Sequence, residues 1–248
     1  MSRIQLVGRG LLVLPLAVVL LGGCTSIDFM GQTVEGSGAR GTRTESAAGV
    51  RRVALGAPGT LVVEVGREGD LRIEGDDNLV ERLVVEREGG RLTIRTPNNT
   101  NFVPELPLSY RVSVESLEGV SVAGSGRVEA AGVDADDFEV EVAGSGDAVI
   151  GDLRATSVDV EIAGSGNATV DGTADAVSVE IAGSGNAEAG GLAARSATVE
   201  IAGSGDVTVR VSDELDVEIA GSGDVHYYGD PRITRSIAGS GDIERAGD

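Results

Sequence analysis

The chain has almost none of the residues on which cross-links and many catalytic sites depend. Its 248 residues include one cysteine, Cys24, one histidine, His226, no lysine and no tryptophan. One cysteine cannot form an intrachain disulfide. The only histidine, His226, is expected at an outward position near the C-terminus, which disfavours a nucleophilic triad or a Cys–His pair, and one Cys with one His is too few ligands for a zinc site. A phosphate cradle is also disfavoured, because no helix or lysine follows the Gly-rich segments. We therefore predict no cofactor and no enzymatic activity.

Positive charge is scarce as well. Twenty arginines stand against 40 Asp and Glu residues, which gives a formal net charge of −20. Such a surface repels nucleic acid, so nucleic acid is not an expected partner. The apolar fraction of 41% is close to that of globular proteins, so we expect most of the chain to fold. Without disulfides, packing and hydrogen bonding must hold that fold together.

The first residues resemble a bacterial lipoprotein signal. Arg3 and Arg9 form a short basic region. The apolar run that follows, Leu11 to Leu21, is too short to span a bilayer and leads into LLGGC, which ends at Cys24. The resemblance implies a signal peptide over residues 1–23 and lipid attachment at Cys24, through which the protein would be anchored in a membrane. The residue after the cysteine is not Asp. In this respect the sequence resembles lipoproteins that are sorted to the outer membrane. We expect an exported, lipid-anchored protein of the cell envelope.

Three segments follow the signal. Residues 24–49 are rich in Gly, Ser and Thr and are predicted to be a flexible tether. Residues 50–119 contain short β-rich runs, predicted to form irregular coils, with a proline-rich surface loop at 97–107. Residues 120–248 contain the repeats, so the predicted solenoid domain spans 50–248.

The repeated unit is Ala-Gly-Ser-Gly, which recurs every 18–20 residues. Its first glycines are Gly124, Gly144, Gly164, Gly183, Gly203, Gly221 and Gly239. A fixed period of this length is typical of a solenoid, whereas a propeller blade needs about 40 residues and leucine-rich repeats need Leu and Asn columns. The sequence therefore predicts an all-β fold, a right-handed parallel β-helix with 18–20-residue coils.

Strict alternation precedes each motif, as in Val160, Glu161 and Ile162. A period of two places Val and Ile inside and Glu outside. The outward glutamates are expected to form one column along the coils: Glu141, Glu161, Glu180, Glu200 and Glu218. After the motif the apolar positions resume, and a variable return follows that carries Leu153, Leu192 or Val211.

We expect the corners to form ladders between coils. Glycine supplies backbone conformations closed to other residues, and serine can bond local backbone or its copy one coil away. The predicted structural corner ladder is Ser125, Ser145, Ser165, Ser184, Ser204, Ser222 and Ser240. The motif is followed by a second polar column: Asp147, Asn167, Asn186, Asp206, Asp224 and Asp242. This column could pair with itself or chelate calcium, so divalent cations are candidate partners.

Several motifs together resemble a known family. NLVERLVVEREGGRLTIRT, from Asn78 to Thr96, is followed by SVESLEGVSVAGSGRV and by recurring AGSGD or AGSGN. In this order they resemble the head GIN domain of putative auto-transporter adhesins, over roughly residues 50–248. The resemblance implies an exported β-solenoid on the cell surface, often behind a lipoprotein signal. The family has no established catalytic residues to carry over.

These observations favour a non-catalytic, lipid-anchored envelope protein that acts as a rigid surface scaffold or an adhesin-like binding module. Its ligand would be an extracellular or envelope glycan or protein. The alternative is a carbohydrate-processing or carbohydrate-binding β-helix protein, for which only one irregular cluster is available: His226, Tyr227, Tyr228 and Arg232. No metal site or catalytic residue is predicted.

The repeat decays at its C-terminal end. Arg235 and Arg245 take positions where earlier coils have inward apolar residues, and Pro231 removes a backbone donor. Charged residues at inward positions are one way in which proteins protect an exposed strand edge. We therefore expect residues 232–248, RITRSIAGSGDIERAGD, to form a cap that prevents end-to-end fibre growth.

Substitution of Cys24 by serine tests the predicted anchor. Cys24→Ser removes the only thiol that could carry the lipid, so the protein should no longer be labelled by palmitate and should accumulate as an uncleaved precursor. Metabolic labelling followed by immunoprecipitation measures both. Equal labelling of the variant and the original chain would disprove lipid attachment at this residue.

Overall fold

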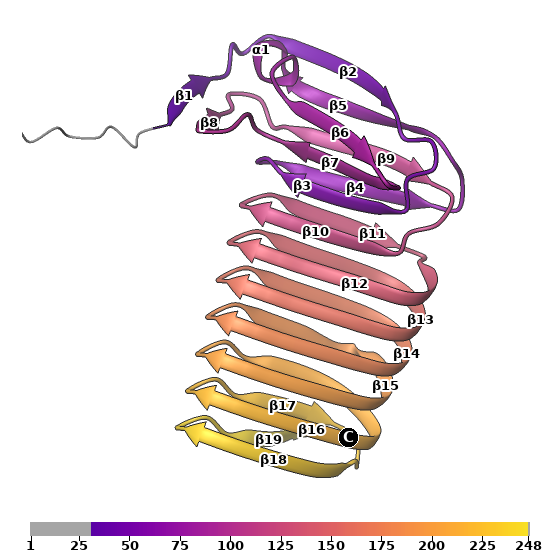
Figure 1. Cartoon of the computed structure of the whole chain (residues 1–248), viewed down its shortest axis with the longest axis vertical. Coiled ribbons are helices and arrows are strands. Elements are labelled where there is room, and N and C mark those ends of the chain that lie inside the picture. The colour runs from indigo at the N-terminus through magenta and orange to yellow at the C-terminus, as the bar shows by residue number, and fades with distance from the viewer. Residues whose placement is uncertain (1–30, 248) are drawn as a thin grey trace, which may run out of the picture. The chain divides into compact units, whose positions relative to one another are not determined.

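The computed structural model describes residues 31–247, which fold almost entirely into β-strands. Seventeen strands form one continuous sheet and two form a small separate one. The helix α1, Asp77–Val80, is four residues long. No helix within residues 31–247 has the length and apolar character needed to cross a membrane. Within this part of the chain the strands are stacked coil upon coil (Figure 1).

The strands fall into an irregular N-terminal group and a regular repeat group. The first group is β1 Gln32–Glu35, β2 Arg40–Ser46, β3 Arg52–Gly56, β4 Thr60–Val65, β5 Asp70–Asp76, β6 Val84–Glu88, β7 Arg91–Arg95, β8 Thr100–Val103 and β9 Ser109–Val114. The second group is β10 Gly119–Gly124, β11 Arg127–Ala131, β12 Asp134–Gly144, β13 Asp147–Gly164, β14 Asn167–Gly183, β15 Asn186–Gly203, β16 Val207–Gly221, β17 Val225–Tyr228, β18 Arg232–Gly239 and β19 Ile243–Gly247.

Neighbouring coils of the repeat group pair in parallel and in register. Glu161 lies opposite Glu141 on one side and Glu180 on the other, and the first glycine of each motif lies opposite its copy. Differences in repeat length are taken up by irregularities in the return, for example between Ile150 and Leu153. Equivalent residues therefore remain stacked. The predicted fold class, an all-β parallel solenoid with 18–20-residue coils, is confirmed.

The core is a stack of Val and Ile side chains. Val160 and Ile162 are each 2% exposed, whereas Glu161 between them is exposed. Full burial of such an aliphatic side chain contributes about 1.5–3 kcal/mol, and every coil repeats it. The inward positions predicted for the returns are also buried: Leu153, Leu192 and Val211. Burial of these repeated rows drives the coils together.

Both glycines of the corner motif are required by close stacking. Gly164 has φ of +130°, and a Cβ there would lie 2.4 Å from the carbonyl oxygen of Gly144 in the preceding coil. At the buried Gly166, a Cβ would lie 2.2 Å from the carbonyl oxygen of Gly146. The first glycine is needed for its backbone angle and for space, and the second for space.

The N-terminal coils do not stack in the order of the sequence. Strands β3 and β4 pair with β10 and β11 on one side and with β7 and β9 on the other, all in parallel. The chain therefore forms the β3–β4 coil first and then continues through β5–β9 on one side of it. It returns to β10 on the opposite side of that first coil. Outside these coils the pairing becomes antiparallel: β5 pairs with β9, β2 pairs with β5, and β6 pairs with β7. The predicted irregular coils thus end in an antiparallel layer.

The tether prediction is wrong where it overlaps the described residues. Strand β2 pairs along all seven of its residues with β5, and β1 pairs with β8. Main-chain hydrogen bonds hold these polar segments, so they carry no hydrophobic pattern that would reveal them. Strand β8 likewise lies inside the predicted loop at 97–107, and its Phe102 is 5% exposed.

Asp76 ties this N-terminal layer together. Its carboxylate is buried and accepts hydrogen bonds from the backbone N–H groups of Gly38 at 2.8 Å, Glu105 at 3.0 Å and Leu106 at 3.0 Å. Burial alone would raise the pKa of Asp76, but these hydrogen bonds outweigh burial and hold the pKa below its ordinary value. The ionised carboxylate therefore stabilises the fold at neutral pH, and that contribution is lost as the pH falls through the lowered pKa.

Alanine substitutions at the first glycine of two motifs should separate the free-energy cost of backbone strain from the cost of contact between coils. At Gly124, φ is +104° and a Cβ would meet nothing within 4 Å, so Gly124→Ala should cost only the strain of an unfavourable φ, about 1–3 kcal/mol. Gly164→Ala should cost distinctly more, because it also drives a carbon onto the Gly144 carbonyl. Chemical denaturation measures both. Equal costs would mean that the corners are not in contact.

Candidate binding face

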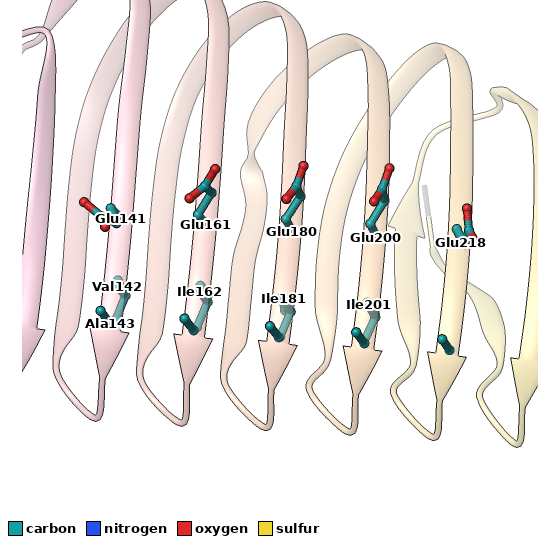
Figure 2. Close-up of a pocket in the computed structure, with 14 residues that line it drawn as sticks. Glu141, Val142, Ala143, Glu161, Ile162, Glu180, Ile181, Glu200, Ile201 and Glu218 are labelled. Atoms are coloured by element: carbon teal, nitrogen blue, oxygen red, sulfur yellow. The ribbon is translucent and has the colours of Figure 1, made fainter.

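The most regular surface of the described residues lies on the outward side of β12–β16, just before the corners. One glutamate per coil occupies the same register position and forms the glutamate row: Glu141, Glu161, Glu180, Glu200 and Glu218. Two residues further along each strand, the outward positions form the alanine strip: Ala143, Ala163, Ala182, Ala202 and Ala220. Figure 2 shows the glutamates leaving successive strands one after another.

The row and the strip line one open groove along the stack, with a volume of about 300 Å³. Val142, Ile162, Ile181 and Ile201 contribute to its lining between them. Because alanine side chains are short, the strip is a shallow apolar floor beside a wall of carboxylates. The groove crosses five coils without interruption and is therefore suited to a long, narrow partner rather than a compact one.

Like charges follow each other closely along the glutamate row. Neighbouring strands lie about 4.8 Å apart, so each adjacent pair of carboxylates repels by about 0.9 kcal/mol in water. At the first position, Glu141 accepts a hydrogen bond from Ser121 Oγ at 2.9 Å and lies 3.5 Å from the Arg91 guanidinium. The side chains of the three central glutamates make no hydrogen bond or ion pair with any residue of 31–247. The centre of the row is therefore electrostatically uncompensated.

The coils around the row are strongly acidic. Residues 128–231 contain 22 Asp and Glu residues but only three arginines. Arg195 pairs with Asp213 at 3.3 Å, and Arg210 lies over the ring of Tyr228, 4.6 Å from its centre. Neither of these cations neutralises the row, which therefore attracts positive charge from solution.

The polar column of Asp and Asn residues that follows the motif is linked by hydrogen bonds between neighbouring coils. Asn167 Nδ2 donates to Asp147 Oδ1 at 3.0 Å, and Asn186 Nδ2 donates to Asn167 Oδ1 at 3.1 Å. In the later coils the donor group changes, because Asp has no side-chain amide: the backbone N–H of Asp224 donates to Asp206 Oδ1 at 3.0 Å. Within residues 31–247, no group of three or more His, Cys, Asp or Glu side chains is arranged to hold a metal ion. These hydrogen bonds link neighbouring members of the column.

The corner serines lie in one row, but their backbone makes the ladder. The N–H of Ser165 donates to the Gly144 carbonyl at 2.8 Å, and the same bond recurs at Ser145, Ser184, Ser204, Ser222 and Ser240. The serine side chains are exposed and make no hydrogen bond with residues 31–247. Cys24, the predicted lipid attachment site, lies outside the described residues.

The aromatic cluster near the C-terminus has a different composition from the one expected. His226, Tyr227 and Tyr228 lie on β17, whereas Arg232 lies on β18 and pairs with Glu214 at 3.4 Å. Arg210 is the cation that packs on Tyr228, and its Nε also donates to the Gly190 carbonyl at 3.0 Å. The repeat register could have revealed this partner, since Arg210 lies directly opposite Tyr228 in the preceding coil.

Comparisons with known proteins agree with this architecture. The model of the family described as putative auto-transporter adhesin, head GIN domain, matches residues 51–231. A crystal structure of a putative adhesin from Bacteroides fragilis is 25% identical, with a TM-score of 0.79 over 86% of this chain and 99% of that one. No functionally curated protein matches the chain.

Two structures from Parabacteroides distasonis are also similar. One, described as a putative lipid binding protein, is 27% identical with a TM-score of 0.71 over 87% of this chain and 100% of that one. The other, described as a putative adhesin, is 21% identical with a TM-score of 0.63 over the same shares of the two chains, and supports the fold alone.

Neutralising the centre of the glutamate row should stabilise the protein. Glu180→Gln removes two adjacent repulsions, with Glu161 and with Glu200, so the melting temperature should rise by a few degrees in low salt. The gain should shrink as sodium chloride screens the remaining charges. Glu188→Gln is the matched control, because Glu188 is exposed and lies outside the row. If both substitutions have the same effect at every salt concentration, the row carries no special repulsion.

Proposed function

The chain belongs to the family of putative auto-transporter adhesins with a head GIN domain, and from this premise we propose that it is a non-catalytic binding protein of the bacterial cell envelope. In this proposal the coils form a rigid support, the glutamate row and alanine strip form the binding surface, and a lipid on Cys24 anchors the chain in the membrane.

The observation that carries this proposal is the uncompensated centre of the glutamate row. Glu161, Glu180 and Glu200 repeat one charge on three successive coils without an internal partner. A ligand that brings positive charges at a matching spacing would offset the repulsion between these carboxylates. The stacked corners hold the backbone of the row in register, so a ligand would have to order the glutamate side chains but not the strands that carry them.

The shape of the groove narrows the class of ligand. Its alanine floor is shallow and continuous over five coils, and its acidic wall presents one carboxylate per coil. An extended polymer with a positive charge on each repeating unit fits both features. We therefore place a glycan with free amino groups first among the ligands to be tested, and a basic peptide second.

Binding to chitosan oligomers tests the proposal, with fully N-acetylated chitin oligomers as the uncharged comparison. The original chain should bind chitosan but not chitin, and the triple variant E161Q/E180Q/E200Q should lose at least tenfold in affinity, because three charged contacts are removed while side-chain size is kept. Isothermal titration calorimetry at low and moderate salt measures the affinity. Polylysine is the peptide probe for the second class of ligand.

The matched control is the triple variant D175N/E188Q/E244Q. These three acids are exposed and lie outside the groove, so the variant loses the same net charge without altering the row. It should bind chitosan as the original chain does, apart from a small general loss of electrostatic attraction. Equal losses in the two triple variants, or no binding of either cationic polymer to the original chain, would refute this binding surface.

A further inference from the structure

Residues 31–46 are held to the rest of the protein in a different way from the coils. We call this segment, which contains β1 and β2, the N-terminal strap (Figure 1). None of its residues is buried, and among them Val34 alone packs, half-buried, against the core. The coils, in contrast, are joined by rows of buried Val and Ile side chains. Hydrogen bonds rather than apolar packing therefore hold the strap in place.

The hydrogen bonds to the strap are concentrated where β1 passes into β2. Asn78 binds this connection through both ends of its side-chain amide. Its Oδ1 accepts from the Ser37 N–H at 3.0 Å, and its Nδ2 donates to the Glu35 carbonyl at 2.8 Å. Asn78 thus uses its donor and its acceptor on the same few residues of the strap.

Two further residues complete a clamp around this connection. The N–H of Asp77 donates to the Ala39 carbonyl at 2.8 Å, and the Asp76 carboxylate accepts from the Gly38 N–H at 2.8 Å. We call residues 76–78 the clamp. It grips the strap in its middle, between the pairing of β1 with β8 and the pairing of β2 with β5.

The elements that carry the clamp have contacts of their own, independent of the strap. Strand β5 pairs with β9 as well as with β2, so it keeps one partner when β2 is absent. Leu79 and Val80 of α1 are at most 2% exposed and belong to the core. The strap can therefore leave as one unit while the coils stay folded, as local unfolding commonly removes the segment with the fewest buried apolar contacts.

We propose that the N-terminal strap is a stored tether, which is docked at rest and released by a pull from the N-terminal side while the coils remain folded. Its role under load rests on the proposed anchor at Cys24, whereas its independent opening does not. A pull on that anchor would enter the described part of the chain at Gly31. It would reach β1, the clamp and β2 in turn before it reaches β3, the first strand of the coils.

The composition of the strap suits both of its states. When the strap is docked, the backbone of Gly, Ser and Thr residues pairs as well as that of any other residue. When the strap is released, a segment with so few apolar side chains can stay extended in water. Its sixteen residues would then add up to about 55 Å of chain between the anchor and the coils.

Hydrogen exchange of the full chain, read by mass spectrometry, tests whether the strap opens alone. In the original chain, peptides from β2 should exchange much faster than peptides from β13, because opening of the strap leaves the core intact. Asn78→Ala removes both bonds of the clamp amide, so it should speed exchange in β2 by about tenfold and leave β13 unchanged. Ser37→Ala, which removes the bond from Ser37 Oγ to Asp77, should have a smaller effect of the same kind.

Asn186→Ala is the matched control. Asn186 also makes two side-chain hydrogen bonds, but both lie within the coils: it donates to Asn167 and accepts from the Asp206 N–H. The substitution should therefore leave exchange in β2 unchanged. If Asn78→Ala speeds exchange in β2 and β13 equally, or if β2 and β13 exchange together in the original chain, the strap does not open on its own and the proposal fails.

Optical tweezers test the response to load. Cys24 is the only cysteine, so in a chain made without export its thiol takes one handle at the point where the anchor would pull. Ser165→Cys, at an exposed corner, takes the other. We expect a reversible lengthening of up to about 55 Å before the coils are lost. Asn78→Ala should lower the force of this first step, and Asn186→Ala should not.

Two mechanical results would overturn the proposal: loss of strap and coils in a single event, and a first step at the same force in Asn78→Ala and the original chain. The failure of the anchor is separable from both. A strap that opens alone in a protein whose Cys24 carries no lipid in cells would refute the anchor and the source of the load, while the independent opening would stand.

Discussion

The contact between successive corners is the constraint on which the rest of the structure depends. In this contact the Gly164 backbone approaches the carbonyl of Gly144 so closely that no side chain fits between them. Each coil is thereby held at the same position relative to the last, and the serine N–H bonds run from coil to coil in one line. Register follows from this contact, and the apolar rows of the core follow from the register.

A surface built in this way multiplies every outward residue. One glutamate in the repeat becomes a row of carboxylates, one alanine becomes a strip, and one Asn becomes a chain of amide hydrogen bonds. Columns that can donate and accept stabilise themselves, as Asn167 and Asn186 do. Columns that only repel, such as the glutamate row, weaken the stack unless a positively charged ligand offsets the repulsion.

The sequence predicts the repeat part well because one period is sampled many times. Val160, Glu161 and Ile162 show inward and outward positions, and the copies of the motif show the register. The N-terminal layer has no such redundancy. Strand β2 is held by main-chain hydrogen bonds that leave no pattern in its side chains, and Asp76 acts through backbone groups far away in the sequence. The glutamate row was predictable from the repeat. The Arg210–Tyr228 contact could be found only by aligning the strands of neighbouring coils, which the sequence allows.

The position of β3 and β4 inside the stack gives the molecule a direction of assembly. These strands are flanked by β7 and β9 on one side and by β10 and β11 on the other. Residues 31–114 can thus complete the antiparallel layer and two coils before any Ala-Gly-Ser-Gly motif is needed. Each later coil then finds a finished edge to pair with and closes a loop of only about 20 residues, which keeps the entropic cost of each step small. For a chain that emerges from its N-terminus, the order of synthesis and the order of stacking coincide from β10 onward.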